Sequence, residues 1–173
     1  MPLVPEVEPA KESKLTWSQI EERAEAVARE YQFDRGAETI RDFAERLGGN
    51  VKVLPPEEVD RLESGSLVVR GERDFDIFLS PSTSILRDNF TIAHELGHYF
   101  LHSGNPPGSD QITATRYGHD RCEQQANRFA AALLMPAAEF REVAARIKKE
   151  ALAGWFRVSA QAVEARRSSL RIA

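Results

Sequence analysis

Apolar positions near the start of the chain recur with the period of a helix. They are spaced by three or four residues over 17–31, directly after a capping-box pattern at Thr16 and Gln19, so we expect an amphipathic helix there. The same spacing over 40–47 predicts a second helix, and Gly48 and Gly49 end it.

Apolar runs in the next part of the chain are short and predict strands. They lie at 51–54, 67–70 and 75–79, and a pair of prolines closes the first of them. The segment 71–74 has the length of a hairpin turn between the other two strands. We therefore expect a small sheet in this region, with 75–79 as an exposed edge.

Helical patterns return in the second half of the chain. A strongly apolar helix begins within 84–89 and ends by Gly104, and an alanine-rich helix spans 121–136. The polar segment 103–120 between them predicts a long loop. Small residues in the alanine-rich helix, at 126, 130, 131 and 132, allow another helix to approach it closely.

The C-terminal pattern is also helical. Apolar positions at 140–147 predict one helix, and those at 152–170 predict a helix-turn-helix-like pair in which Ser159 caps the last helix. Pro136 precedes these helices, at a place where proline ends one helix or opens the next.

Strands followed by helices, without regular alternation, favour the α+β fold class, as a small sheet with surrounding helices. We expect three parts. Residues 1–14, rich in Pro, Glu and Lys, form a flexible lead; 15–148 form the main domain; and 149–173 form the C-terminal helices packed on it.

The composition is that of an ordinary globular protein. Of 173 residues, 42% are hydrophobic and 29% charged, which suits one domain with a real core. No apolar run is long enough to cross a membrane, and the first residues lack the basic and apolar regions of a signal peptide. The single cysteine, Cys122, allows no internal disulfide and is expected to be a buried, inert thiol. We therefore expect a cytoplasmic protein.

Charge is unevenly distributed along the chain. The net charge is −4, yet residues 146–173 contain seven Lys or Arg and two Glu, a net of +5, which leaves −9 for the residues before them. A basic end can contact nucleic acid or an acidic partner, but it also describes a solvated helical face. The start of the last helix offers one side chain, Gln161, suited to reading DNA bases. Direct DNA binding is therefore a secondary prediction.

The strongest chemical signal is His94-Glu95-Leu96-Gly97-His98 in the apolar helix. Histidines four residues apart on a helix lie about 40° apart around its axis, so both imidazoles can reach one metal ion. Glu95 lies one residue off that line, where it can act as a general base without being a ligand. We expect a metal ion on His94 and His98, with Glu95 as the base.

A catalytic zinc needs a third protein ligand besides two histidines. His102 continues the same helical face, but eight residues of straight helix cover about 12 Å. His94 and His102 therefore cannot share one ion unless the helix breaks between them. We expect His102 to be packed or to support a ligand.

Groups further along the chain supply the candidates for the third ligand: Glu123, Asp120, Asp110 and His119. Glu123 is favoured because it begins the alanine-rich helix, and a helix holds a ligand more rigidly than a loop. Asp120 is the next choice. Asn127, one helical turn beyond Glu123, is placed either to hydrogen-bond to a metal ligand or to lie on a solvated face.

Two segments of the chain resemble the ImmA/IrrE family of metallopeptidases. The first is NFTIAHELGHYFLH, and the second, EQQANRFAAALLMP, follows it in the family's order and spacing. The strand FDIFLS and the C-terminal segment resemble the family more loosely. The resemblance implies a zincin-like, gluzincin-type domain in which His94, His98 and Glu123 bind zinc and Glu95 is the general base.

The resemblance also implies a function. Proteins of that family are usually intracellular zinc-dependent endopeptidases of bacteria and their mobile elements. They cut or inactivate a helix-turn-helix repressor and so derepress stress, phage or mobile-element genes. The alternative is a regulatory module that keeps its zinc without cleaving and that binds a repressor or DNA. A base beside a three-ligand site favours the enzyme, because a structural zinc is usually closed by four ligands.

Two details of catalysis are expectations at this stage. We expect the substrate to add a strand to the sheet edge at 75–79. Tyr99, Tyr117 and His119 are the candidates for stabilising the oxyanion besides zinc, and the sequence does not choose among them.

Overall fold

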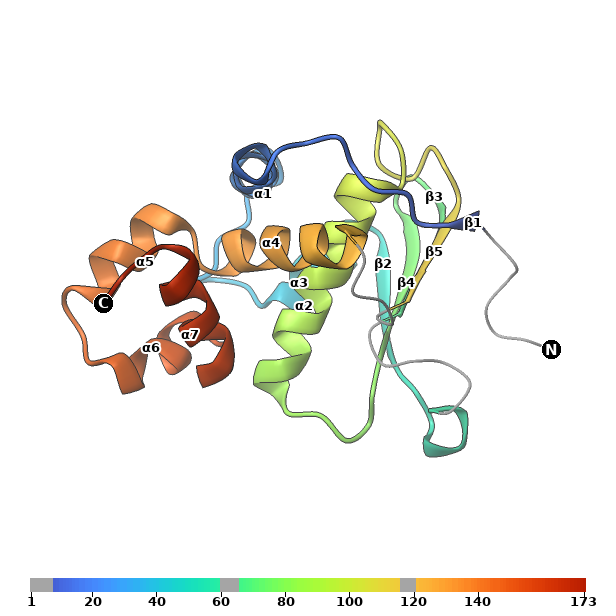
Figure 1. The fold of residues 1–173 in the computed structure, drawn as a ribbon. Helices are drawn as coiled ribbons and strands as arrows, with labels where there is room; N and C mark the ends of the chain where they lie inside the picture. Colours follow the sequence, from blue (N-terminus) through green and yellow to red (C-terminus); the bar gives the residue numbers. More distant parts are fainter. Residues whose placement is uncertain (1–7, 60–65, 116–120) are drawn as a thin grey trace.

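The computed structural model describes residues 8–59, 66–115 and 121–173, which form a mixed α+β structure (Figure 1). The α-helices in this part of the chain are α1 (Trp17–Glu30), α2 (Ile40–Arg46), α3 (Ile85–His102), α4 (Arg121–Leu134), α5 (Ala137–Ala144), α6 (Lys149–Phe156) and α7 (Ala160–Ser169). The strands are β1 (Glu8–Pro9), β2 (Gly49–Val53), β3 (Ser66–Gly71), β4 (Asp74–Leu79) and β5 (Ile112–Thr115), with a short 3-10 helix η1 (Pro56–Glu58). The predicted helices and the three predicted strands are all present at nearly the expected bounds.

The strands form one sheet in the order β1-β5-β3-β4-β2. Strand β3 pairs antiparallel with β4 and β5, whereas β2 is parallel to β4 and β1 is parallel to β5. The expectation that 75–79 is an exposed edge is therefore wrong, since β4 has a neighbour on each side. Local pattern showed the hairpin partner of β4, but the parallel pairing with β2 is long-range.

Strand β5 lies inside the segment 103–120, which was predicted to be a loop. Its residues alternate, with Ile112 and Ala114 buried in the core. Four residues are too few for that alternation to stand out in the sequence.

The described part of the predicted flexible lead, 8–14, also has structure. Residues Glu8 and Pro9 form β1 on the outer side of β5. Further on, the backbone N–H of Ser13 donates to Gln125 Oε1 at 2.9 Å. These partners lie more than a hundred residues away, so a composition rich in Pro, Glu and Lys could not indicate them.

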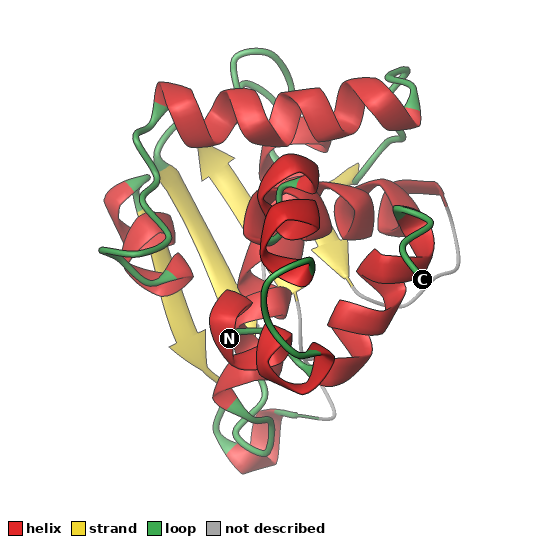
Figure 2. Ribbon diagram, turned by 90° about the vertical axis from the view of Figure 1, so that its left-hand side faces the viewer, coloured by secondary structure: helices red, strands yellow, loops and turns green. Residues whose placement is uncertain are grey.

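The helices cover one face of the sheet, as the two views in Figures 1 and 2 show. Alternate side chains of β4, namely Phe75, Ile77 and Leu79, are buried in the main core beneath these helices. Phe78 belongs instead to a small second cluster with Leu54 and Val68. The sheet thus has a deep core on its helical face and a thin apolar cover on the other.

Helices α3 and α4 cross at very close range. A Cβ atom added at Gly97 of α3 would lie 3.0 Å from both the Cα and the carbonyl oxygen of Ala126 in α4. Real Cβ atoms rarely come that close, so this crossing requires glycine on one side and a small residue on the other. The small residues of the alanine-rich helix were predicted to permit such an approach, and this prediction is confirmed.

Helices α6 and α7 are joined by a tight turn in which Arg157 adopts a left-handed conformation, with φ of 55°. The Ser159 side chain accepts a hydrogen bond from Ala162 N, as expected for a cap. Phe156 of α6 and Val163 of α7 are buried in the same core cluster as the residues of α3 and α4. The two helices are therefore packed on the rest of the molecule.

No helix in the described ranges has both the length and the apolar character that crossing a membrane requires.

Replacing Gly97 by Ala is expected to destabilise the protein by about 1–3 kcal/mol, because the new methyl group forces α3 and α4 apart. The matched control is Gly154→Ala in α6, where an added Cβ meets nothing within 4 Å. That control should gain about 0.5–1 kcal/mol from helix propensity. Urea denaturation measures both; equal effects of the two substitutions would contradict the close crossing.

Asp76 is an ionised group on the thinly covered face of the sheet. Its carboxylate accepts hydrogen bonds from Lys52 at 2.7 Å, from Arg70 at 3.0 Å and from Asn50 at 3.1 Å. Burial raises the pKa of Asp76, but these hydrogen bonds outweigh burial and lower the pKa to about 2. Because the folded-state pKa is depressed, the stabilisation is full above about pH 4 and is lost as the pH falls toward 2.

Asp76→Asn should therefore lower the free energy of unfolding by roughly 2 kcal/mol at pH 7, and by roughly half as much at pH 3. Asp74→Asn, which removes an exposed partner of Arg70, is the control and should cost under about 1 kcal/mol. Urea denaturation at the two pH values checks this. A cost of Asp76→Asn that does not change with pH would count against it.

Candidate metal centre

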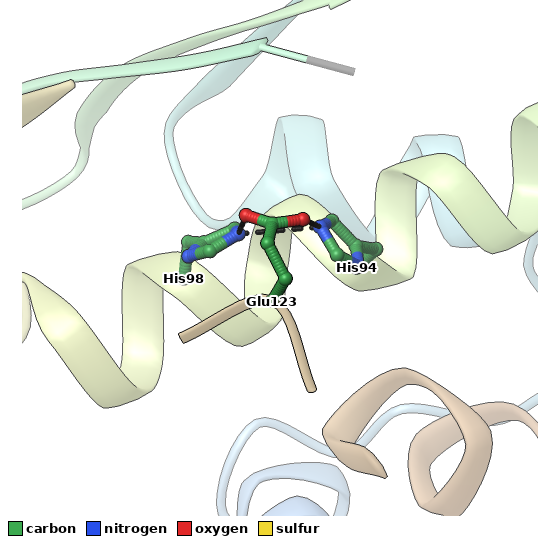
Figure 3. Close-up of side chains that lie close together, drawn as sticks. All are labelled: His94, His98 and Glu123. Atoms are coloured by element: carbon green, nitrogen blue, oxygen red, sulfur yellow. Dashed lines mark hydrogen bonds and ion pairs between the residues drawn. The ribbon is translucent and has the colours of Figure 1, made fainter. Parts of the chain in front are cut away.

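Three polar side chains meet where α3 and α4 cross (Figure 3). His94 and His98 point from successive turns of α3, with their Nε2 atoms 3.2 Å apart. Glu123 from the first turn of α4 lies between them: its Oε2 is 3.1 Å from His94 Nε2 and its Oε1 is 2.9 Å from His98 Nε2. The two His residues and the favoured third candidate thus come together as the sequence predicted.

The three donor groups fit a small divalent cation. Their ligand atoms all lie within 4.8 Å of one another, and the three residues are buried. Tetrahedral ligands about 2.0–2.1 Å from a zinc ion are about 3.3 Å apart. The two Nε2 atoms are 3.2 Å apart, and each lies 2.9 or 3.1 Å from the nearer oxygen of Glu123. Two imidazoles and one carboxylate, converging from two helices, can therefore hold a metal ion.

The carboxylate of Glu123 is ionised in this site. Burial raises its pKa, but hydrogen bonds with His94 and His98 outweigh burial and lower the pKa to about 2. The group is therefore a charged donor at any physiological pH, as a metal ligand must be.

The outer nitrogen of His94 is held by Asn127, one turn beyond Glu123 on α4. The distance from His94 Nδ1 to Asn127 Oδ1 is 2.8 Å. Because an amide oxygen only accepts, His94 donates its Nδ1–H to Asn127, so Nε2 is the nitrogen that is available to a metal ion. Asn127 thus supports a ligand, which was one of the two alternatives that the sequence left open.

The outer nitrogen of His98 meets a different group. Its Nδ1 lies 3.0 Å from Nδ1 of His102, and His102 Nε2 lies 2.9 Å from Gln125 Oε1. His102 is buried, and burial lowers its pKa to about 4, so that its imidazole is neutral. As expected from helix geometry, His102 supports a ligand and is not among the three donors. Sequence reasoning missed Gln125, for which the signal was a polar residue on the buried side of an alanine-rich helix.

A comparison with protein-family models identifies the family of the chain. Residues 63–168, more than half of the chain, match the model of the IrrE N-terminal-like domain, a peptidase family. The chain belongs to this peptidase family. The match spans both α3 and α4, so it contains all three donors of the centre. Neither a search of curated proteins nor a search of solved structures gave a significant match.

In this member of the peptidase family, Glu95 lies between the two histidines on α3 and its side chain is completely buried. It is not one of the three donor residues. The position beside them, one residue along the helix from His94, is the one that a general base requires.

The other candidate residues that the structure describes lie outside the donor cluster. Asp110 is exposed and does not belong to the donor cluster. The hydroxyl of Tyr99 accepts a hydrogen bond from Arg73 N at 3.3 Å, and its ring packs on Phe75, so it supports the β3–β4 hairpin. Cys122 is buried, and its thiol donates to the carbonyl of Ala10. Tyr117, His119 and Asp120 lie outside the described residues.

A groove begins beside the centre at Asn127 and runs between α4, α7 and the first turns of α3. It has a volume of about 870 Å³, and its lining includes Phe90, Arg87 and Arg128. The groove therefore lies next to the centre, since Asn127 in its lining hydrogen-bonds to His94.

The basic C-terminal segment contains one arginine that is not on the surface. Arg166 is only 1% exposed. Its guanidinium donates to the carbonyl of Met135 at 2.9 Å and to Glu21 at 3.0 Å. This side chain ties α7 to α1 and to the end of α4, and it cannot contact a nucleic acid phosphate.

Removing Glu123 should abolish stable metal binding. After dialysis, the wild-type protein is expected to retain about one divalent ion per chain. Glu123→Ala loses a donor group, so its affinity for the ion should fall by well over the 10–100-fold that is typical of losing a supporting hydrogen bond. Elemental analysis and chelator competition measure both values. Asp110→Ala is the control and should bind like the wild type; loss of metal from this variant would argue against the assignment.

Proposed function

We propose that the protein is a zinc-dependent endopeptidase that cleaves or inactivates a helix-turn-helix transcriptional repressor. The observation that carries the proposal is the convergence of His94, His98 and Glu123 on one point, with Glu95 adjacent on the same helix, inside a peptidase-family domain. Cleavage of the repressor derepresses the stress, phage or mobile-element genes that it controls. This role places the protein in the cytoplasm.

Zinc is the proposed metal because of the donor set. Two neutral imidazoles and one carboxylate form a common three-ligand set of catalytic zinc, with a fourth position left open for water or substrate. When bound, zinc supplies a Lewis acid that polarises the scissile carbonyl and makes water acidic enough to attack it.

The chain's own residues perform the remaining steps. Asn127 and His102 keep the outer protons on His94 and His98, so that both Nε2 atoms present lone pairs. Glu95 accepts a proton from the attacking water and then returns it to the nitrogen of the leaving amine. Because Glu95 is buried, few bulk water molecules compete for that proton.

The groove beside Asn127 offers an entry for the substrate chain, in place of the sheet edge first expected. Its lining includes Asn127, which hydrogen-bonds to His94, and Arg87 and Arg128 supply positive charge along it. We assign to it the part of the repressor that flanks the scissile bond. The choice of a repressor as substrate is supported by the resemblance to the ImmA/IrrE family and by membership of the peptidase family.

Glu95→Gln should retain the metal and reduce cleavage by at least about 100-fold, because the amide cannot accept the proton. We would quantify metal in both proteins and incubate each with the helix-turn-helix repressor encoded beside the gene, following fragments by mass spectrometry. Cleavage by the variant at the wild-type rate would exclude Glu95 as the base.

The same experiment separates the enzyme from a non-cleaving regulatory module. Metal in both proteins, no fragments from either, and release of the repressor from its operator by both would favour the module. Duplex DNA without repressor tests the secondary prediction of direct DNA binding, which requires a salt-dependent complex.

A further inference from the structure

Residues 8–15, which we call the N-terminal strap, run from the edge of the sheet to the start of α1. The strap is anchored at β1, where Ala10 N donates to Thr113 O at 3.2 Å, and it then passes the first turns of α4. There the thiol of Cys122 donates to the carbonyl of Ala10. This segment lies outside the matched family domain, and its contacts on α4 end within two residues of Glu123.

One buried amide holds the strap against α4. Gln125 is completely buried. Its Oε1 accepts from the backbone N–H of Ser13 at 2.9 Å, and its Nε2 donates to the backbone carbonyl of Ser13 at 2.8 Å. Because the backbone of Ser13 offers one donor and one acceptor, only one orientation of the amide satisfies both.

The orientation of Gln125 decides which nitrogen of His102 carries a proton. Gln125 Oε1 also lies 2.9 Å from His102 Nε2. An amide oxygen cannot donate, so the proton must be on Nε2 of His102, and a neutral imidazole then has a bare Nδ1.

The bare Nδ1 of His102 in turn decides which nitrogen of His98, a proposed metal ligand, carries the proton. The Nδ1 atoms of His98 and His102 are 3.0 Å apart, which requires one proton between them. Since His102 Nδ1 is bare, His98 donates its own Nδ1–H, and its Nε2, which lies 2.9 Å from Glu123 Oε1, is the nitrogen left for a metal ion. The opposite placement of protons would set two lone pairs against each other at Gln125 or would require the amide to turn away from Ser13.

We propose that the N-terminal strap is a determinant of metal affinity, acting through Gln125 and His102 as positioning residues that hold His98 in its metal-binding tautomer. The linkage is reciprocal: a metal ion on His98 must also hold the strap on α4. A partner or a cut that lifts the strap would therefore loosen the metal. The inference rests on the proposed metal site but not on cleavage of any substrate.

The first test compares two substitutions of Gln125 in the full chain. Gln125→Met removes the hydrogen bonds of the side-chain amide to Ser13 and His102 and should weaken zinc binding by roughly 10–100-fold in chelator competition. Gln125→Glu keeps an acceptor for both His102 Nε2–H and Ser13 N–H but loses the donor to the Ser13 carbonyl, so its affinity for zinc should lie between that of Gln125→Met and that of the wild type. A role in packing alone predicts the reverse order, because a buried carboxylate fits worse than an apolar side chain of similar size.

A second pair of substitutions, at Ser13, changes no buried side chain of the core. Ser13→Pro removes the backbone N–H that orients the amide, whereas Ser13→Ala keeps it. We expect about 10-fold weaker zinc binding for the proline variant alone. In the wild type, adding zinc should slow hydrogen exchange at the Ser13 amide, a readout independent of enzymatic activity.

The outcomes distinguish the two proposals. If the wild type binds no metal, the proposed function fails together with this inference. If the wild type binds zinc but Gln125→Met and Ser13→Pro bind it within two-fold as well, only the role of the strap is overturned. Weaker binding in both variants, with partial rescue by Gln125→Glu, supports it.

Discussion

The close approach of α3 and α4 is the constraint on which the candidate metal centre depends. Gly97 and Ala126 touch at the crossing, and the functional side chains stand on either side of them along the two helices. His98 follows Gly97, while Glu123 and Asn127 lie within one turn of Ala126. A larger residue at the contact would separate the carboxylate from the imidazoles, so backbone packing sets the geometry of the donors.

Buried imidazoles are costly unless both of their nitrogens have partners. Here each ligand histidine directs one nitrogen toward Glu123 and the other toward a group that holds a proton in place: His94 toward Asn127, and His98 toward His102. Both arrangements end on amide oxygens of α4, those of Asn127 and Gln125. One helix therefore supplies the third donor and also controls the protons on the other two.

The sequence predicted the helices well because their signals are local. The capping box at Thr16, the cap at Ser159 and the apolar periods of α3 and α4 are read within a few residues. The sequence did not predict the sheet correctly. Strand β5 is too short to be recognised from its pattern, and the identity of the edge strand depends on which strands pair. Strand β4 became an interior strand through a parallel partner that no local pattern indicates.

By itself, the sequence determined the groups of the candidate centre: two histidines one helical turn apart, a glutamate beside them, and a carboxylate at the start of a helix with small residues. Only the tertiary structure decided what surrounds these groups. Ser13 and Gln125 are 112 residues apart, and neither residue type marks a site. Helical periodicity is a property of neighbouring residues, whereas a hydrogen bond between distant segments exists only after the chain has folded.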